Sequence, residues 1–221
     1  MFHACQRKVF IPNYYLVRSI GYAPLELLNN KNYKVYDEIA IIQLNYQDKN
    51  IIVTKLDELK VKYEKLPYKY GGPLALAFYK AIIILPYQVS IMETMENFRY
   101  GVAMIVPSER LFRELLEDNR YIFSAKNLKD IPEGIKKYVE FYHDNFKDLF
   151  VYFDKWEDLT EIIEKTDFNK VKEKGKEFIQ HYEKYALNIW AQALELIPPD
   201  DIIRDKQPIC DNTDFYNYKH E

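Results

Sequence analysis

Residues 80–108 read KAIIILPYQVSIMETMENFRYGVAMIVPS, and this stretch decides the fold class. It begins with the most apolar run of the chain, residues 80–86, and ends near a second apolar run at residues 102–106. Such runs are typical of parallel strands that helices cover on both faces. Between them, methionine and phenylalanine recur at helical spacing, and Gly101 stands where a helix usually stops. The stretch therefore predicts a strand–helix–strand unit with a right-handed crossover.

The alternation of strand and helix extends to both sides of this unit. Upstream, the β-branched runs predict strands at residues 8–11, 38–42 and 51–54, and the charged stretches predict helices at residues 25–28 and 56–66. The whole pattern indicates an α/β fold, a Rossmann-like parallel sheet flanked by helices, with a long C-terminal helix.

The downstream elements carry their own start and stop signals. Ser108 is the predicted N-cap of a helix whose buried stripe consists of Leu111, Phe112, Leu115 and Leu116. A strand at residues 149–153 is followed by a helix with Asp154 as N-cap and Glu157 at capping-box spacing. A long amphipathic helix, or a broken pair of helices, is predicted at residues 168–197, where Pro198-Pro199 ends it.

Composition limits the class of protein. The 221 residues are 48% hydrophobic and 29% charged, as in a globular chain and unlike a disordered or membrane protein. A net charge of -3 provides no general attraction to nucleic acid or to anionic lipid. Because the chain has two cysteines and no signal-like or membrane-spanning run, we expect a cytoplasmic protein. We expect one domain at residues 1–197 and a polar, acidic tail at residues 198–221.

A ligand site is expected where the strand at residues 80–86 ends. Open α/β sheets bind ligands at the carboxyl ends of their strands, next to helix N-termini. A helix that starts near Ser90 directs N–H groups and the positive end of its dipole at this crevice, which can hold a diphosphate without a metal ion. Glu96 lies further along the helix, where its carboxylate can accept hydrogen bonds from the hydroxyls of a ribose.

Each of these features also has an ordinary structural interpretation. Ser90 and Glu93 have the spacing of a capping box, Glu96 fits a solvated helix position, and Gly71-Gly72 fits a turn. Their joint spacing is what favours a ligand site over these separate interpretations.

Four segments together resemble the C-terminal, nucleotide-sugar-binding domain of GT-B glycosyltransferases, of the kind found in eukaryotes and large DNA viruses. They are Tyr70-Gly71-Gly72-Pro73, residues 85–90 (LPYQVS), residues 96–101 (ENFRYG) and Pro107-Ser108. In that superfamily a helix carries a Glu with a Gly five positions on, as Glu96 and Gly101 do here. Residues 150–159 show a weaker similarity to the later strand and helix of the family.

The resemblance implies a metal-independent glycosyltransferase that needs no cofactor. It would move a sugar from a nucleoside diphosphate sugar to a hydroxyl of a glycan or glycoprotein acceptor. It implies that Glu96 binds the ribose, that Ser90 meets the diphosphate, and that the Gly71-Gly72 loop approaches the donor closely. The family commonly adds a basic pair at the diphosphate, for which Arg18 is the first candidate and Lys80 the second.

Two departures from the family pattern keep an alternative open. The position of the family's first glutamate is occupied by Gln88, which can bind a sugar hydroxyl but carries no negative charge. The acceptor site and the general base are expected on a partner domain outside this chain, so no catalytic residue is assigned. The alternative is a non-catalytic sugar-nucleotide-binding or scaffolding module of a multidomain transferase.

Other classes lack their motifs. The four histidines show no metal-site spacing, the acidic residues after Pro199 fit a solvated tail, and no glycine-rich dinucleotide motif or P-loop follows a strand. A third interpretation, a protein that only binds a partner, depends on the aromatic side chains of the helix at residues 168–197.

Overall fold

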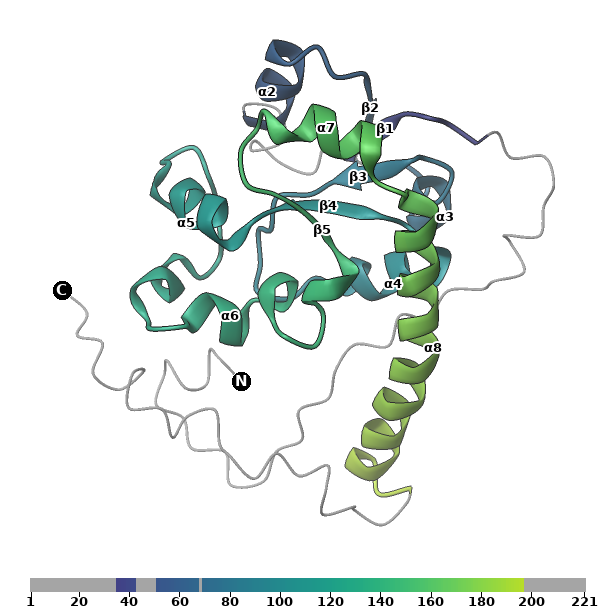
Figure 1. The fold of residues 1–221 in the computed structure, drawn as a ribbon. Helices are drawn as coiled ribbons and strands as arrows, with labels where there is room; N and C mark the ends of the chain where they lie inside the picture. Colours follow the sequence, from purple (N-terminus) through teal and green to yellow (C-terminus); the bar gives the residue numbers. More distant parts are fainter. Residues whose placement is uncertain (1–34, 43–50, 68, 197–221) are drawn as a thin grey trace. The chain divides into compact units, whose positions relative to one another are not determined.

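The computed structural model describes residues 35–42, 51–67 and 69–196, and it has an α/β architecture (Figure 1). Of the described residues, those up to Gln180 belong to one compact unit and those from His181 onward belong to another. The strand expected at residues 8–11, the helix at residues 25–28 and the tail at residues 198–221 lie outside the described residues. Within the described ranges, every helix falls short of the length or apolarity that a membrane crossing requires.

In the part of the chain that the structure describes, five parallel strands form the sheet in the order β2-β1-β3-β4-β5. Their bounds are Ile39–Ile42 for β1, Tyr63–Leu66 for β2, Ala81–Ile83 for β3, Met104–Pro107 for β4 and Val151–Phe153 for β5. Every residue of β1, β3 and β4 is buried, whereas the edge strands keep some exposure. Full burial of the central strands requires cover on both faces, which is the pattern of a parallel α/β sheet.

Helices alternate with the strands and flank the sheet. The α-helices are α2 (Val53–Glu58), α3 (Pro73–Leu76), α4 (Met92–Tyr100), α5 (Glu109–Glu117), α6 (Gly134–Tyr138), α7 (Asp158–Lys165) and α8 (Phe168–Ala193). Three short 3-10 helices, η3 (Lys126–Asp130), η4 (Glu140–Tyr142) and η5 (Lys147–Leu149), lie between α5 and β5. In Figure 1 the strands cross the middle of the view, with α2 and α7 above them and α4 and α6 below. The predicted Rossmann-like sheet with its long C-terminal helix is therefore confirmed.

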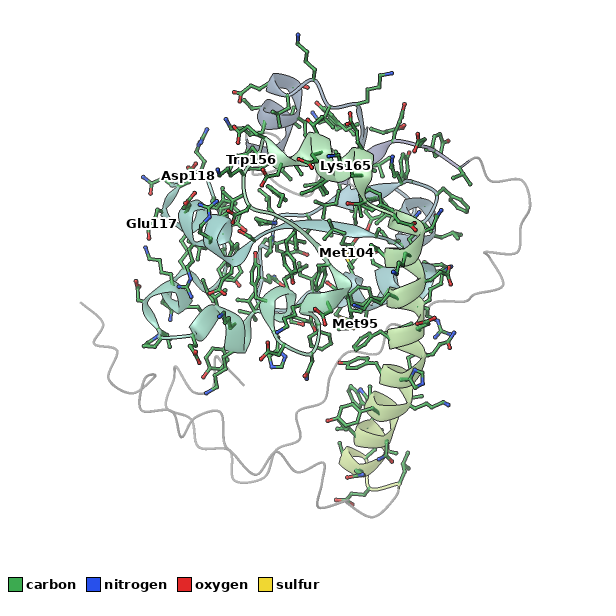
Figure 2. The ribbon with its side chains drawn as sticks, in the orientation of Figure 1. Met95, Met104, Glu117, Asp118, Trp156 and Lys165 are labelled. Atoms are coloured by element: carbon green, nitrogen blue, oxygen red, sulfur yellow. The ribbon has the colours of Figure 1, made fainter. Side chains whose placement is uncertain are left out.

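The core lies between the sheet and these helices. Met95 of α4 and Met104 of β4, both labelled in Figure 2, are almost completely buried. The ring of Phe98 on α4 lies 5.5 Å from that of Phe150 and 5.9 Å from that of Phe178 on α8, centroid to centroid. Close packing of this kind makes the position of α4 sensitive to residues far away in the sequence.

Two of the predicted elements are wrong. The predicted strand at residues 51–54 runs into α2, and the predicted helix at residues 56–66 is replaced by the end of α2 and by β2. Ile51, Ile52 and Leu56 are buried, so packing overrides the β-propensity of the isoleucines. The charged residues Glu64 and Lys65 fit a strand because β2 is an edge strand with exposed side chains.

The helix caps agree only in part with the sequence signals. Ser108 caps α5 as predicted, since its Oγ accepts a hydrogen bond from the N–H of Leu111 at 3.2 Å. Gly101 ends α4 in the left-handed conformation, with φ 69° and ψ 49°. Asp154, however, does not cap α7, because the helix begins at Asp158, whose carboxylate accepts the Asp154 N–H at 3.2 Å.

Candidate functional site

The order of the strands predicts a ligand site beside β3. β1 and β3 are neighbours in the sheet. From β1 the chain crosses to β2, on the side of β1 away from β3, and from β3 it crosses to β4, on the side of β3 away from β1. Adjacent strands whose connections diverge in this way leave an opening at their carboxyl ends, which is where open α/β sheets bind ligands. The segment from Ile84 to Ile91 follows β3 at this edge, as the sequence predicts.

The β3–α4 loop is fixed by a segment that is distant in the sequence. The phenol of Tyr121 donates to the carbonyl of Pro86, and the N–H of Ser124 donates to the carbonyl of Tyr87 at 3.0 Å. The N–H of Glu140 donates to the carbonyl of Val89 at 2.8 Å. These carbonyls accept bonds from three separate residues, so the insertion between α5 and β5 determines the path of the loop.

Ser90 does not cap α4. The helix begins at Met92 with Ile91 as the N-cap residue, and no side chain forms a cap hydrogen bond there. Ser90 Oγ instead donates to Glu140 Oε2 at 3.0 Å. The capping-box interpretation of Ser90 and Glu93 is therefore wrong, because each side chain has a partner elsewhere in the fold.

The Gly71-Gly72 loop requires glycine. Gly71 has φ 95° and Gly72 has φ 79°, and the ψ of -171° at Gly72 puts it in a region that side chains other than hydrogen rarely allow. Gly72 is the N-cap residue of α3, and Pro73 occupies the first turn. The loop therefore turns sharply just before α3, as the sequence predicts.

A hydrogen bond joins this loop to α4. Tyr70 Oη donates to Glu93 Oε1 at 2.6 Å, and both residues are partly buried. Glu93 lies three residues before Glu96, so the two carboxylates share one face of α4. The structure thus brings the Gly71-Gly72 loop to the same place as Glu96.

Two tyrosines and two glutamates make up this polar cluster, which we call the Tyr70 cluster: Tyr70, Tyr87, Glu93 and Glu96. Burial raises the pKa of Tyr70 well above its usual range, and the bond to Glu93 and the charges of Glu93, Glu96 and Tyr87 raise it further. Burial also raises the pKa of Glu96, and the neighbouring carboxylate of Glu93 adds to that increase. The cluster is rich in hydrogen-bond acceptors, which suits a ligand that offers hydroxyl groups.

The remaining predicted residues lie in different places. Gln88 is exposed on the β3–α4 loop, and Arg18 lies outside the described residues. Lys80 precedes β3, at the amino edge of the sheet, where its Nζ lies 3.3 Å from Asp37 Oδ1. Because the ligand site is predicted at the carboxyl end of β3, this position is unsuitable for a clamp on a diphosphate.

The first half of α8 packs against residues that neighbour the Tyr70 cluster. Gly175 permits close contact with α4, since a Cβ added there would lie 3.1 Å from Cδ1 of Phe98. Lys172 Nζ donates to the carbonyls of Ala77 and Tyr79 at 3.2 and 2.6 Å, directly after α3. α8 therefore contacts the neighbours of both the Gly71-Gly72 loop and Glu96.

Three members of the cluster were not predicted as site residues. The spacing of Glu93 and Glu96 on one helix face is a signal that sequence analysis could have used. Tyr70 adjoins the Gly71-Gly72 pair, but its bond to Glu93 spans 23 positions. Nothing in the sequence signals the convergence of Tyr87 with these residues.

Comparison of the sequence with protein-family models and with curated proteins finds no match in either set.

Proposed function

We propose that this chain binds a nucleoside diphosphate sugar at the Tyr70 cluster and the β3–α4 loop, as the donor-binding part of a GT-B-type glycosyltransferase. The observation that supports this proposal most directly is the hydrogen bond from Tyr70 to Glu93. It brings the glycine loop, which the family resemblance assigns to the donor, next to the helix face that carries Glu96.

The carboxylates suit the ribose of such a donor. A cis-diol offers two hydroxyl donors, and an ionised carboxylate accepts both through its two oxygens. Burial and the charge of Glu93 raise the pKa of Glu96, so the surroundings of this side chain disfavour its charged form. Hydroxyl groups bonded to Glu96 would stabilise its charged form and so gain affinity.

The start of α4 suits the diphosphate. No side chain forms a cap hydrogen bond at this end of α4. The nine-residue helix therefore presents the positive end of its dipole at the carboxyl edge of the sheet. Ser90 adds a hydroxyl on the loop, although in the structure it is bonded to Glu140.

A non-catalytic donor-binding module is the second candidate, and Gln88 favours it. Gln88 is exposed at the position where the family carries a glutamate, and an amide cannot stabilise a positively charged transition state. On this alternative, the acceptor and the catalytic groups come from another domain. The composition and the two cysteines are consistent with a cytoplasmic location for either candidate.

A calorimetric titration with UDP-, GDP- and dTDP-sugars in the absence of metal tests the proposal. We expect one nucleotide class to bind, and Glu96→Gln to weaken that binding at least about tenfold, because one charged hydrogen bond contributes about 1.5–3 kcal/mol. Glu164→Gln, at an exposed position on α7, is the matched control. Unchanged affinity in a folded Glu96→Gln variant, or no binding of any donor, would contradict the proposal. Transfer or hydrolysis of a bound donor would distinguish the enzyme from the non-catalytic module.

A further inference from the structure

We propose that a cavity between α5, α6 and the segment from η4 to η5 is a second binding site, which takes the phosphate group of a small molecule. The cavity has a volume of about 700 Å³, which lies within the usual range for small-molecule sites. None of the described residues predicted for the donor site lines it. The inference depends on this cavity alone, and it holds whether or not the Tyr70 cluster binds a nucleotide sugar.

Basic side chains from three segments line the cavity. Lys136 and Lys137 belong to α6, His143 follows η4, and Lys147 is the first residue of η5. Among the described residues, Lys137 forms no ion pair, and its Nζ lies 5.4 Å from the centroid of the Tyr138 ring. Lysines grouped around one concave space are a usual means by which a protein binds a phosphate, and His143, whose Nδ1 accepts the N–H of Asn145 at 3.2 Å, adds a neutral imidazole.

Three carboxylates, Glu109, Glu133 and Asp144, line the cavity beside its three lysines, and they pair with these lysines incompletely. Glu109 forms an ion pair with Arg113, whose Nη2 and Nε donate to Glu109 Oε1 at 2.7 and 3.1 Å. Lys136 Nζ lies 3.9 Å from Glu109 Oε2, which is beyond hydrogen-bond distance. Glu133 also lines the cavity, where its side chain is exposed to solvent. Lys136 is therefore able to bind another anion.

Asp144 marks the position where the anion would bind. Its carboxylate accepts a bond of 2.6 Å from Lys147 Nζ, and its side chain is 85% exposed. Lys147 lowers the pKa of Asp144 most, and His143 and Lys136 lower it further. Three basic groups thus act on one carboxylate that is exposed enough to move away. A phosphate carries more negative charge and more acceptor oxygens, so it would displace Asp144 from these groups.

Two tyrosines form the apolar wall beside the basic groups. Tyr142 is buried, with its Oη donating to the carbonyl of Pro107 at 3.0 Å. Tyr152 Oη donates to the carbonyl of Phe141 at 2.6 Å, and the rings of Tyr142 and Tyr152 lie 6.2 Å apart, centroid to centroid, at an angle of 28°. Because both phenols are held by backbone carbonyls, the wall is rigid. The organic part of a phosphorylated ligand can pack against it.

The test measures the binding of inorganic phosphate by calorimetry to the full chain. We expect the double variant Lys136→Met/Lys147→Met to weaken phosphate binding at least about tenfold, since two charged hydrogen bonds are lost. We expect Asp144→Asn to strengthen binding about threefold, because it removes the competing carboxylate. The control is Lys155→Met/Lys165→Met, which removes two exposed lysines outside the cavity. Circular dichroism establishes that each variant is folded.

Two results would overturn the inference. One is the absence of phosphate binding to the unaltered chain at millimolar concentration, and the other is equal binding by the cavity and control variants. Parallel titrations with glucose 1-phosphate and with UMP identify the source of the phosphate, because the ligand with the matching organic part binds more tightly than phosphate alone. Binding of phosphate to the unaltered chain, when no nucleotide sugar binds to that same chain, would reject only the proposed function. Loss of phosphate binding in the lysine variant with unchanged nucleotide-sugar affinity would show that the two sites are separate.

Discussion

Tyr70 Oη donates a hydrogen bond of 2.6 Å to Glu93 Oε1, and this bond connects the loop before α3 to a partly buried face of α4. The donor side chain belongs to a loop that turns through two glycines with positive φ, and the acceptor belongs to the helix that carries Glu96. The geometry of the candidate site therefore depends on a contact between side chains as well as on the order of the strands.

Removing this bond should loosen the loop. We expect Tyr70→Phe to lower the free energy of unfolding by about 1–2 kcal/mol, because a partly buried bond to a carboxylate is lost while the ring remains. Urea denaturation measures the change. Tyr63→Phe is the control, since it removes an exposed bond to Asp57 at 2.8 Å and should change stability by less than about 0.5 kcal/mol. Equal effects of the two substitutions would mean that the Tyr70 bond has no special role.

A side chain at residue 72 should strain the backbone without a steric clash. A Cβ added to Gly72 would meet no atom within 4 Å, but φ is 79° there. We therefore expect Gly72→Ala to destabilise the fold by about 1–3 kcal/mol through its backbone conformation alone. Thermal unfolding provides the measurement. A variant as stable as the original chain would show that the loop adopts another conformation.

The stability of the protein should depend on the charge of Glu96. Burial and Glu93 raise the pKa of Glu96 in the folded state. The protonated carboxyl of Glu96 therefore adds to the free energy of unfolding. This contribution is fully present below the ordinary pKa of Glu and is lost as the pH rises through the raised pKa. Glu96→Gln, which stays neutral, should be more stable than the original chain at neutral pH by a few tenths to about 1 kcal/mol. Urea midpoints should show this advantage disappear near pH ~4. If Glu96→Gln is more stable than the original chain by the same amount at every pH, the charge of Glu96 is not the cause of the difference.

Substitution by alanine should lower the free energy of unfolding more at Ser108 than at Ser90, although both residues precede a predicted helix. Ser108→Ala removes the bond that caps α5, and we expect a loss of about 1 kcal/mol. Ser90→Ala removes only an exposed bond to Glu140, with an expected loss below about 0.5 kcal/mol. Denaturant unfolding of both variants under identical conditions measures the difference. The reverse ranking would indicate that α4 begins at Ser90 after all.

The sequence predicts most of the central fold because the central strands are buried on both faces. The runs around β3 and β4 contain few polar residues, and Gly101 and Ser108 mark helix ends through local geometry. The edge strand β2 has no such signal, since Glu64 and Lys65 remain exposed. Its pairing depends on β1, with Ile39 opposite Tyr63, and a contact of that kind does not show in a local pattern.

The candidate site was predictable where one helix or one turn defines it. Glu96 and the Gly71-Gly72 loop belong to local patterns, and the structure brings them together. Tyr70 and Tyr87 reach the cluster only through tertiary packing. The partner of Ser90 is also tertiary, because Glu140 lies 50 positions away in an insertion with no clear periodicity.

The contact between Gly175 and Phe98 has an evolutionary consequence. A Cβ at residue 175 would lie 3.1 Å from the ring of Phe98, so the two positions share a fixed volume. A larger residue at 175 is compatible with the same helix spacing only if the residue at 98 becomes smaller. Homologous chains that keep this packing should therefore vary at the two positions together. Selection that preserves the position of α4, the helix that carries Glu96, would then also restrict which residues can occupy position 175 on α8.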